Sequence, residues 1–441
     1  MIFGKYAAIG GAVSLALLWP FASGHVGESV YEREVQSLES PYASVEKVSY
    51  DRGYLSSHVK TLVTLKGTVK EDFEAEGLPT TYTFDSNVDH GFLSISTTTT
   101  LEMTPEIEKF AALLWPTGES PFEVRSETSV LGDTQYSAEL RAIKASDDDF
   151  SFTTTPLAVS GTVDKDGNNV FSMSWPSVDM AGQQSGEKLS IKDMTGSGSG
   201  YMHDGEIWIG KQTFNAASML FDDALGSVTT LNNVTADVSN ELSVESADKG
   251  TGAEEQEGRR LDNKNLFTIG KVEVSDEFAV DNFKFGVSFN DLDYNSMLSL
   301  SDIANSMGSE PTEQEMALLV SALDTLVERG LGLEIQPLEL DASEGHVDAS
   351  FDLTLAPGTV NATQDIGAMI NKLTGNLNIT VPTAYVEGAP QLAPMLKNLE
   401  EYGFVSQGEE GVKLSAKIEG EEAVSPSGER MPLGFLMMMF M

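Results

Sequence analysis

Period-two alternation is the sequence feature that most constrains how this chain can fold. The segment His58–Lys66 alternates polar and apolar residues, is rich in Thr and Val, and is followed by Gly67. Such alternation is typical of antiparallel strands that have one face toward the core and one toward solvent. The same pattern recurs at 80–84, 92–103, 122–130, 136–143, 157–163, 170–175, 228–244, 266–274, 283–289, 331–340, 347–355, 377–381 and 412–418. We therefore predict a strand-dominated α+β fold, with long antiparallel strands bent into a curved sheet and a few helices packed on one face.

Helical periodicity interrupts this pattern in three places. The clearest is Thr312–Arg329, where Thr312 can cap the first turn and Gly330 can end the helix. A second helix is predicted at Pro390–Tyr402, and a weaker helical pattern covers Phe214–Leu225.

An apolar run without charges, Tyr6–Gly24, follows Lys5 near the amino terminus. About 19 helical residues span roughly 29 Å, which matches the hydrocarbon core of a bilayer. Positive charge before the run and acidic residues after it predict a cytoplasmic tip at 1–5, a transmembrane signal-anchor at 6–24 and an exported remainder. A cleaved signal peptide ending at Ala22-Ser23-Gly24 and a buried core helix are the alternatives.

The exported part divides into segments by composition. We expect a helical stalk over residues 25–42, a first strand-rich half at 43–247, a charged loop at 248–264 and a second strand-rich half at 265–441. Pro156-Leu157 and Pro337-Leu338 would each open a strand in corresponding places, which suggests an internal duplication.

Charge and cysteine content exclude several classes of function. The 441 residues include 68 acidic and 27 basic side chains, for a net charge of −41, so the clustered Lys and Arg of a nucleic-acid binder are missing. Without cysteine the chain has no disulfide, iron–sulfur cluster, thiolate zinc site or cysteine nucleophile. A solvated acidic surface is the simplest interpretation of the many carboxylates.

Two short motifs look like functional sites but are better explained as turns. Gly196–Gly200 has no serine midway between its outer glycines and no Lys-Ser/Thr ending, so it is neither a nucleophile elbow nor a phosphate loop, and we expect a flexible turn. Asp164–Asn168 resembles the start of a calcium loop, but its glycine comes too early and the bidentate glutamate is missing. A hairpin turn is the better prediction there.

The five histidines are scattered, and none forms a metal-binding motif. Asp89-His90 is the most suggestive local pair, but adjacent strand residues point to opposite faces, so a structural role for His90 is favoured. No metal, cofactor or catalytic residue is predicted.

Four motifs give the chain a resemblance to the YdgA-like family of bacterial envelope proteins, a family without a known function. They are Tyr50-Asp51-Arg52-Gly53-Tyr54-Leu55-Ser56-Ser57, Asn87-Val88-Asp89-His90-Gly91, Ile335-Gln336-Pro337-Leu338 and Met431-Pro432-Leu433-Gly434. The resemblance runs from the predicted anchor to the carboxyl end. It implies a single-pass inner-membrane protein of a Gram-negative bacterium, with most of its mass in the periplasm, no established enzymatic activity and a link to motility in some members.

The motif residues themselves read as determinants of the fold. Gly53 permits a turn, Ser56-Ser57 begin a strand, His90-Gly91 end another, and Arg52 can bridge carboxylates. The tail from Phe435 to Met441 is too short to span a membrane and is expected to form the last packed turn of the domain.

Three functional hypotheses remain at this point. The leading one is a non-enzymatic, membrane-anchored periplasmic protein that binds a protein partner or an amphiphile, since strands such as Phe283–Phe289 offer apolar faces. The second is a hydrolase that acts on envelope polymers through two carboxylates converging in one cleft. The third is a scaffold that forms a homodimer through its membrane helix, where Gly10-Gly11 would allow close approach.

Overall fold

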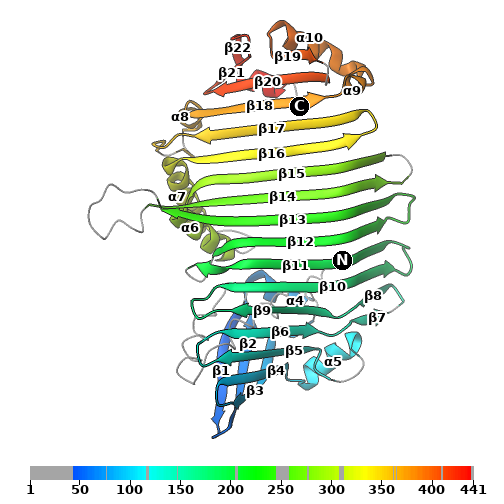
Figure 1. Ribbon diagram of the computed structural model, residues 1–441, viewed down its shortest axis with the longest axis vertical. Helices are drawn as coiled ribbons and strands as arrows, with labels where there is room; N and C mark the ends of the chain where they lie inside the picture. The colour runs from blue at the N-terminus through cyan, green and yellow to red at the C-terminus, as the bar shows by residue number, and fades with distance from the viewer. Residues whose placement is uncertain are drawn as a thin grey trace. The chain divides into compact units, whose positions relative to one another are not determined.

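A computed structural model describes residues 43–438 of the chain, apart from short stretches at 76, 116–118, 147, 204–206, 245–257, 276–277, 307–311, 361, 364 and 409–410 (Figure 1). The chain divides into an N-terminal unit up to Leu225 and a C-terminal unit from Gly226, and the described residues 304–306 group with the N-terminal unit. The predicted tip (1–5), anchor (6–24) and stalk (25–42) lie outside the described residues. Among the described helices, none is long and apolar enough to cross a membrane.

The N-terminal unit is an antiparallel meander in which each strand pairs with the next, as predicted from the alternation. Its strands are β1 (Ala43–Arg52), β2 (Ser56–Leu65), β3 (Thr81–His90), β4 (Ser94–Leu101), β5 (Phe122–Ser129), β6 (Thr134–Leu140), β9 (Leu157–Val163), β10 (Asn169–Gly182), β11 (Lys188–His203) and β12 (Ile207–Asp222). A short hairpin of β7 (Lys144–Ser146) and β8 (Phe150–Thr154) precedes β9, and β8 pairs with β10. Helices α4 (Gly67–Ala75) and α5 (Pro105–Leu114) follow β2 and β4; the sequence patterns did not predict them.

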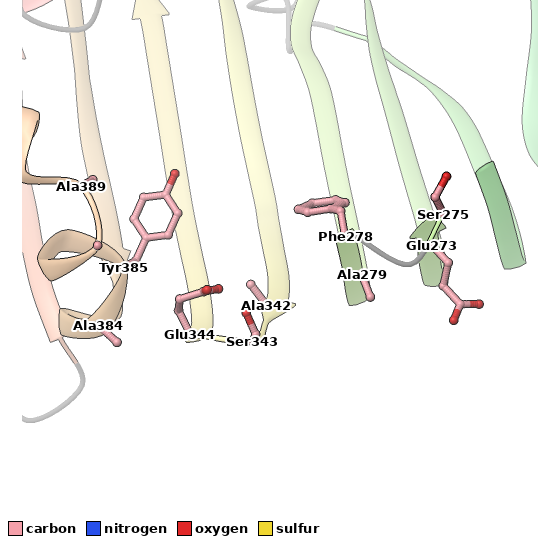
Figure 2. Close-up of a pocket in the computed structure, with 11 residues that line it drawn as sticks. Glu273, Ser275, Phe278, Ala279, Ala342, Ser343, Glu344, Ala384, Tyr385 and Ala389 are labelled. Atoms are coloured by element: carbon pink, nitrogen blue, oxygen red, sulfur yellow. The ribbon is translucent and has the colours of Figure 1, made fainter. Parts of the chain in front are cut away.

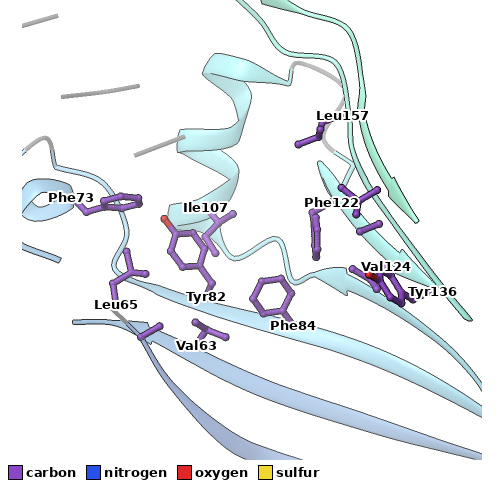
Figure 3. Packing of buried hydrophobic residues seen from close by; sticks show 13 residues of the cluster. Val63, Leu65, Phe73, Tyr82, Phe84, Ile107, Phe122, Val124, Tyr136 and Leu157 are labelled. Atoms are coloured by element: carbon purple, nitrogen blue, oxygen red, sulfur yellow. The ribbon is translucent and has the colours of Figure 1, made fainter. Parts of the chain in front are cut away.

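The main core of this unit forms where the two helices pack against the sheet (Figure 3). Phe73 of α4 and Ile107 of α5 share one buried cluster with Val63 of β2 and with Tyr136 and Leu157 of β6 and β9. Since β2 and β9 lie several strands apart in the meander, their side chains meet only if the sheet curves around the helices. The prediction of a curved sheet with helices on one face therefore fits this unit.

The glycine-rich stretch Gly196–Gly200 is not a turn, and the expectation of a flexible turn is wrong. It lies inside β11 and pairs with β10 and β12 on both sides. Aromatic rings from the neighbouring strands fill the space that the missing side chains leave: a Cβ on Gly198 would lie 2.5 Å from the ring of Phe171. Phe171 in turn packs edge-to-face on Trp208, with ring centroids 6.0 Å apart. Strand pairing and aromatic packing thus compensate for the low strand propensity of glycine.

The C-terminal unit is a second antiparallel meander. Its strands are β13 (Val228–Val244), β14 (Arg259–Val274), β15 (Phe278–Asp293), β16 (Leu331–Ala342), β17 (Gly345–Leu355), β18 (Leu373–Val381) and β20 (Gly411–Glu419), with β19 (Val405–Gly408), β21 (Glu422–Val424) and β22 (Arg430–Pro432) added at one edge. Its helices are α6 (Tyr294–Ser306), α7 (Glu313–Arg329), α8 (Ile366–Ile370), α9 (Thr383–Glu387), α10 (Ala393–Glu401) and α11 (Leu433–Met438), and a 3₁₀ turn at Pro390–Leu392 leads into α10.

Two of the three predicted helices are confirmed and one is wrong. Thr312 caps α7 through a reciprocal pair of hydrogen bonds with Glu315, and Gly330 follows its last residue. The helix predicted at Pro390–Tyr402 is α10 with its preceding 3₁₀ turn. The segment Phe214–Leu225, in contrast, belongs to β12 up to Asp222, because its alternating residues pair with β11.

The division between the two parts of the chain also differs from the predicted one. The units separate at Leu225, and residues 259–264 of the predicted charged loop belong to β14, where they pair with β13 and β15. The remainder of that loop lies largely outside the described residues. Pro337-Leu338 lies within β16, whereas the duplication hypothesis requires these residues to open a strand.

A buried polar cluster holds α6 and α7 at one end of the strands. The guanidinium of Arg260 donates hydrogen bonds to the carbonyl oxygens of Arg329 (2.9 Å) and Asp291 (3.2 Å). Asp293 accepts from the backbone N–H and the hydroxyl of Ser296 at the start of α6, at 2.9 and 2.7 Å. These contacts tie the beginning of α6 and the end of α7 to β14 and β15, and both helices lie at this end of the strands (Figure 1).

Candidate functional site

An apolar face extends across five strands of the C-terminal unit. Phe267 of β14 pairs with Phe285 of β15, Phe285 with Leu338 of β16, Leu338 with Ala349 of β17, and Ala349 with Ile379 of β18. Directly paired residues of an antiparallel sheet project from the same face. These five side chains therefore form one apolar row across the sheet.

The rows on either side extend this apolar face, because every second residue of a strand shares a face. We name as the apolar face this row together with Ile269, Phe283, Val287, Phe289, Leu333, Ile335, Leu340, Val347, Phe351, Leu353, Leu377 and Val381. From Phe283 to Phe289 it runs roughly 20 Å along β15, and it covers about 19 Å across the five strands. Polar residues border it at both ends of β14. At one end Asn263 donates to Asn240 at 2.7 Å and Asn265 donates to Asn263 at 2.5 Å, and at the other Lys271 pairs with Asp281 of β15 beyond Ile269 and Phe283.

The opposite face of the same strands is polar and mainly acidic. Lys284 and Glu339 form an ion pair across β15 and β16 at 2.8 Å. Asn376 of β18 donates to both carboxylate oxygens of Asp352 at 3.1 Å. The second face is therefore suited to contact with water, whereas the apolar face is not.

The apolar face is only partly shielded from solvent. Phe267 is 43% exposed and Phe289 is 38% exposed, and the remaining members are half-buried. The buried hydrophobic cluster of this unit, built around Leu399 and Phe404, reaches the face only at its β18 edge. On the other side α7 contacts β15 near one end of the strands (Figure 1). The footprint of this face, about 400 Å², is within the range of the largest apolar patch on a typical monomer, and such patches are often functional.

A pocket of about 800 Å³ lies at the end of the strands remote from α7 (Figure 2). Phe278 of β15 and Tyr385 of α9 line it from two sides, and both rings are about half-exposed. The turn between β16 and β17 forms its floor with Ser343 and Glu344, and Glu273 of β14 adds a second carboxylate. The pocket therefore combines two aromatic rings with an acidic rim.

The charges of the pocket favour a cationic or hydrogen-bond-donating group over an anion. A hydrogen bond from the Ser343 hydroxyl lowers the pKa of the Glu344 carboxyl, so this group is ionised at neutral pH. Glu273 is ion-paired with Lys271 at 2.7 Å, so the net negative charge of the rim comes from Glu344. Each Asp or Glu in the described part of the chain with a displaced pKa is displaced downward.

The structure brings two of the four sequence motifs together. Gly53 forms the turn between β1 and β2, where its N–H donates to the Ser56 carbonyl at 2.7 Å. Ser56 and Ser57 begin β2, and the hydroxyl of Ser57 lies 3.0 Å from Nε2 of His90 at the end of β3. The predicted structural positions of these residues agree with the structure. Tyr50 and Arg52 lie at the end of β1, Asp89 precedes His90 in β3, and Gly91 begins the next turn.

The other two motifs lie elsewhere. Leu338 is a member of the apolar face, and Pro337 precedes it in β16. Pro432 ends β22, and Gly434 lies in α11, which covers the expected last turn of the domain up to Met438. The alternation of Phe283–Phe289 signalled an apolar strand face, whereas nothing in the sequence pointed to the pocket, because its lining residues come together only through the turns.

The candidate turn and metal motifs have simple explanations. Asp164 accepts hydrogen bonds from the N–H groups of Asp166 and Asn168, both at 2.9 Å, and thereby closes the predicted hairpin turn between β9 and β10. Within the described ranges, no group of three or more His, Asp or Glu residues is placed to hold a metal ion.

Comparisons with known proteins give a family but no function. No curated protein matches the chain, and no solved structure matches it either. One family, described as bacterial protein of unknown function (DUF945), matches residues 5–431. Because this match covers nearly the whole sequence, the chain belongs to the bacterial DUF945 family of proteins of unknown function.

Proposed function

We propose that this protein is a YdgA-like, non-enzymatic envelope protein whose C-terminal unit binds an amphiphile, with an acyl chain on the apolar face and a head group in the pocket. The proposal includes anchoring in the inner membrane by residues 6–24, with the bulk of the chain in the periplasm. The observation that carries it is the apolar face, whose members on β14–β17 remain half-buried or exposed.

The size and shape of the face suit an acyl chain better than a small rigid ligand. It is flat, about 20 Å long and flanked by the pocket at one end. Each methylene removed from water contributes about 0.8 kcal/mol, so an acyl chain of about 16 carbons with half its surface on the sheet gains about 6 kcal/mol. Because such a gain alone gives weak binding, contacts of the head group would have to add to it.

The acidic rim of the pocket limits the head group. Glu344 repels phosphate or carboxylate and attracts an ammonium group, whereas Glu273 is already paired with Lys271. The ring of Tyr385 at the same pocket can also stack on a cation. We therefore expect a zwitterionic, amine-bearing amphiphile in preference to an anionic one.

The hydrolase alternative has weaker support. A carboxylate hydrolase needs a general acid whose pKa is raised, whereas the Ser343 hydrogen bond lowers the pKa of Glu344. The homodimer alternative depends on Gly10-Gly11, which lies outside the described residues.

Binding of a fluorescent acyl-chain probe to the full-length protein in mild detergent tests the proposal. The double variant Phe267→Glu/Phe289→Glu places charges on the apolar face, and Thr268→Glu/Ser288→Glu places the same charges on the opposite face of the same strands. We expect the first variant to bind the probe at least tenfold more weakly and the second to bind it within twofold of the parent protein.

Mass spectrometry of lipid that copurifies with the protein should show the same difference between the two variants. Equal loss of binding in both, with unchanged unfolding midpoints, would refute a role for the apolar face. Absence of probe binding by the parent protein would refute the proposed function altogether.

A further inference from the structure

Three neighbouring hairpins of the N-terminal unit carry large apolar side chains at their tips. They are Tyr54-Leu55 between β1 and β2, Phe92-Leu93 between β3 and β4, and Val130-Leu131 between β5 and β6. These six side chains, which we call the tip row, are between 65% and 95% exposed. Single exposed apolar residues are common, but three consecutive hairpins with a pair each need a cause.

The tip row follows a repeat in the sequence. Tyr54, Phe92 and Val130 are spaced by 38 residues, and the first two turns share the pattern Gly-aromatic-Leu-Ser. A Cβ on Gly53 would lie 2.5 Å from the Ser56 carbonyl oxygen, and one on Gly91 would lie 2.6 Å from that of Ser94. Glycine therefore permits a tight turn that leaves the next two side chains outside the sheet. The repeated turn geometry presents the same kind of side-chain pair twice.

Hydrogen bonds between hairpins hold the tips in line. The carbonyl oxygen of Leu55 accepts from the N–H of His90 at 2.7 Å, and that of Leu93 accepts from the N–H of Val130 at 3.0 Å. The contact between Ser57 and His90 joins the first two hairpins again at their side chains. Alternate strand pairs are roughly 10 Å apart, so the three tips form a row about 20 Å long. The motifs at residues 50–57 and 87–91, which meet at His90, thus hold the tip row in place.

We propose that the tip row inserts into the interface of a zwitterionic lipid bilayer, as a membrane contact additional to the predicted anchor. The tips are convex, and Tyr54 and Phe92 are almost fully exposed, so they fit a fluid phase that closes around each side chain. A tyrosine and a phenylalanine beside leucines match the mixture of aromatic and aliphatic residues found at membrane interfaces.

The flanking charges decide the type of bilayer. Asp51, Asp89 and Asp133 lie within a few residues of the three tips, and Arg52 is the basic residue beside them. An anionic surface attracts clustered Lys and Arg and repels carboxylates. Insertion must therefore depend on the apolar side chains, and a zwitterionic bilayer is the surface that this charge pattern allows.

The predicted anchor places such a bilayer within reach. Strand β1 carries the chain about 30 Å from Ala43 to Arg52, so the tips lie at the far end of the strands. The 18 residues between the predicted anchor and Ala43 span about 27 Å as the predicted helical stalk and at most about 60 Å if extended. The row can therefore touch the bilayer that holds the anchor or a second one that faces it.

Site-specific fluorescence on the full chain tests this inference, and the lack of cysteine makes labelling simple. Phe92→Cys carries an environment-sensitive fluorophore at a tip, and Glu74→Cys carries it on the exposed surface of α4 at the other end of the strands. The protein is incorporated into vesicles of phosphatidylcholine with and without brominated acyl chains. We expect bromine to quench the label at residue 92 at least twofold and the label at residue 74 by less than a tenth.

Two comparisons separate the bilayer from other occupants. Replacing Tyr54, Leu55 and Leu93 by serine should cut the quenching at residue 92 by half or more, while the serine substitutions at Val48 and Val170, exposed but outside the row, leave it unchanged. Quenching at residue 92 no greater than at residue 74 overturns the proposal. The proposal is also overturned if residue 92 is shielded only when other membrane proteins are present. It is equally overturned if residue 92 becomes shielded without lipid as the protein concentration rises. Acyl-probe binding by the C-terminal unit is measured separately, so either idea can fail alone.

Discussion

Replacing Gly196 in β11 by alanine should destabilise the protein only while Phe214 is present. A Cβ at this position would lie 2.9 and 3.0 Å from two ring carbons of Phe214, whereas carbon atoms in contact normally lie about 3.5–4.0 Å apart. Overpacking of this kind costs about 1–3 kcal/mol. Alanine in place of glycine within a strand by itself raises the free energy of unfolding by about 0.5–1 kcal/mol. We therefore expect Gly196→Ala to lower the free energy of unfolding by about 0.5–2 kcal/mol.

In the background Phe214→Ala the sign should reverse. The ring that blocks the new methyl group is gone, and the third neighbour, the flexible end of Met173 at 3.3 Å, can move aside. Gly196→Ala should then raise the free energy of unfolding by about 0.5–1 kcal/mol. The coupling energy between the two positions is accordingly about 1–3 kcal/mol.

Urea unfolding followed by tryptophan fluorescence measures this cycle, because Trp175 and Trp208 lie on the two strands that flank β11. The four proteins need equal denaturant dependence for the free energies to be compared. Equal effects of Gly196→Ala in both backgrounds would show that aromatic rings do not fill the glycine positions, and the explanation given for this strand would be refuted.

Three further predictions concern other parts of the fold. Leu399→Ala removes a side chain with 0% exposure from the core around α10 and should cost about 2–5 kcal/mol in urea unfolding, against less than half of that for the half-buried Leu396→Ala. Thr312→Ala removes the cap of α7 and should cost about 1 kcal/mol, seen as faster hydrogen exchange in the first turn of that helix, with Thr325→Ala as the control. Partial burial alone would raise the pKa of Asp179, but hydrogen bonds from Lys192, Ser177 and Ser190 together lower it to about 2. This group therefore stabilises the fold above its unfolded pKa near 3.8, and its contribution disappears as pH falls toward 2. Since the side chain is 43% exposed, about 1 kcal/mol is expected, and Asp179→Asn should show correspondingly less loss of stability between pH 4 and pH 2.

Alternation predicted most of the strands because the two faces of the sheet select different residue types, and successive residues of a strand point to opposite faces. In β15 the pattern of Phe283–Phe289 is set by an apolar face on one side and polar groups such as Lys284 on the other. The same logic located β13 at its observed bounds, Val228–Val244. Helix α7 was predictable for a separate reason. Thr312 and Gly330 mark its two ends through contacts within the neighbouring turn, so a short stretch of sequence contains the signal.

The failures have physical causes that a local pattern does not contain. Glycines in β11 are tolerated because Phe171 and Phe214 come from the neighbouring strands, and no window around residue 198 includes them. The pocket and the tip row likewise depend on which turns lie side by side.

The two proposed contacts divide the molecule by the kind of apolar surface that each unit exposes. In the N-terminal unit helices α4 and α5 pack against the sheet, and its most exposed large apolar side chains include those of the tip row, at turns such as Gly91–Leu93. In the C-terminal unit α6 and α7 occupy one end of the strands, and the apolar surface is a flat face that continues toward a pocket lined by α9 at the other end. Convex apolar groups can enter a fluid layer, whereas a flat face shields a single extended chain. A chain with a net charge of −41 gains nothing from anionic surfaces, so the apolar contacts would have to supply the attraction in both units.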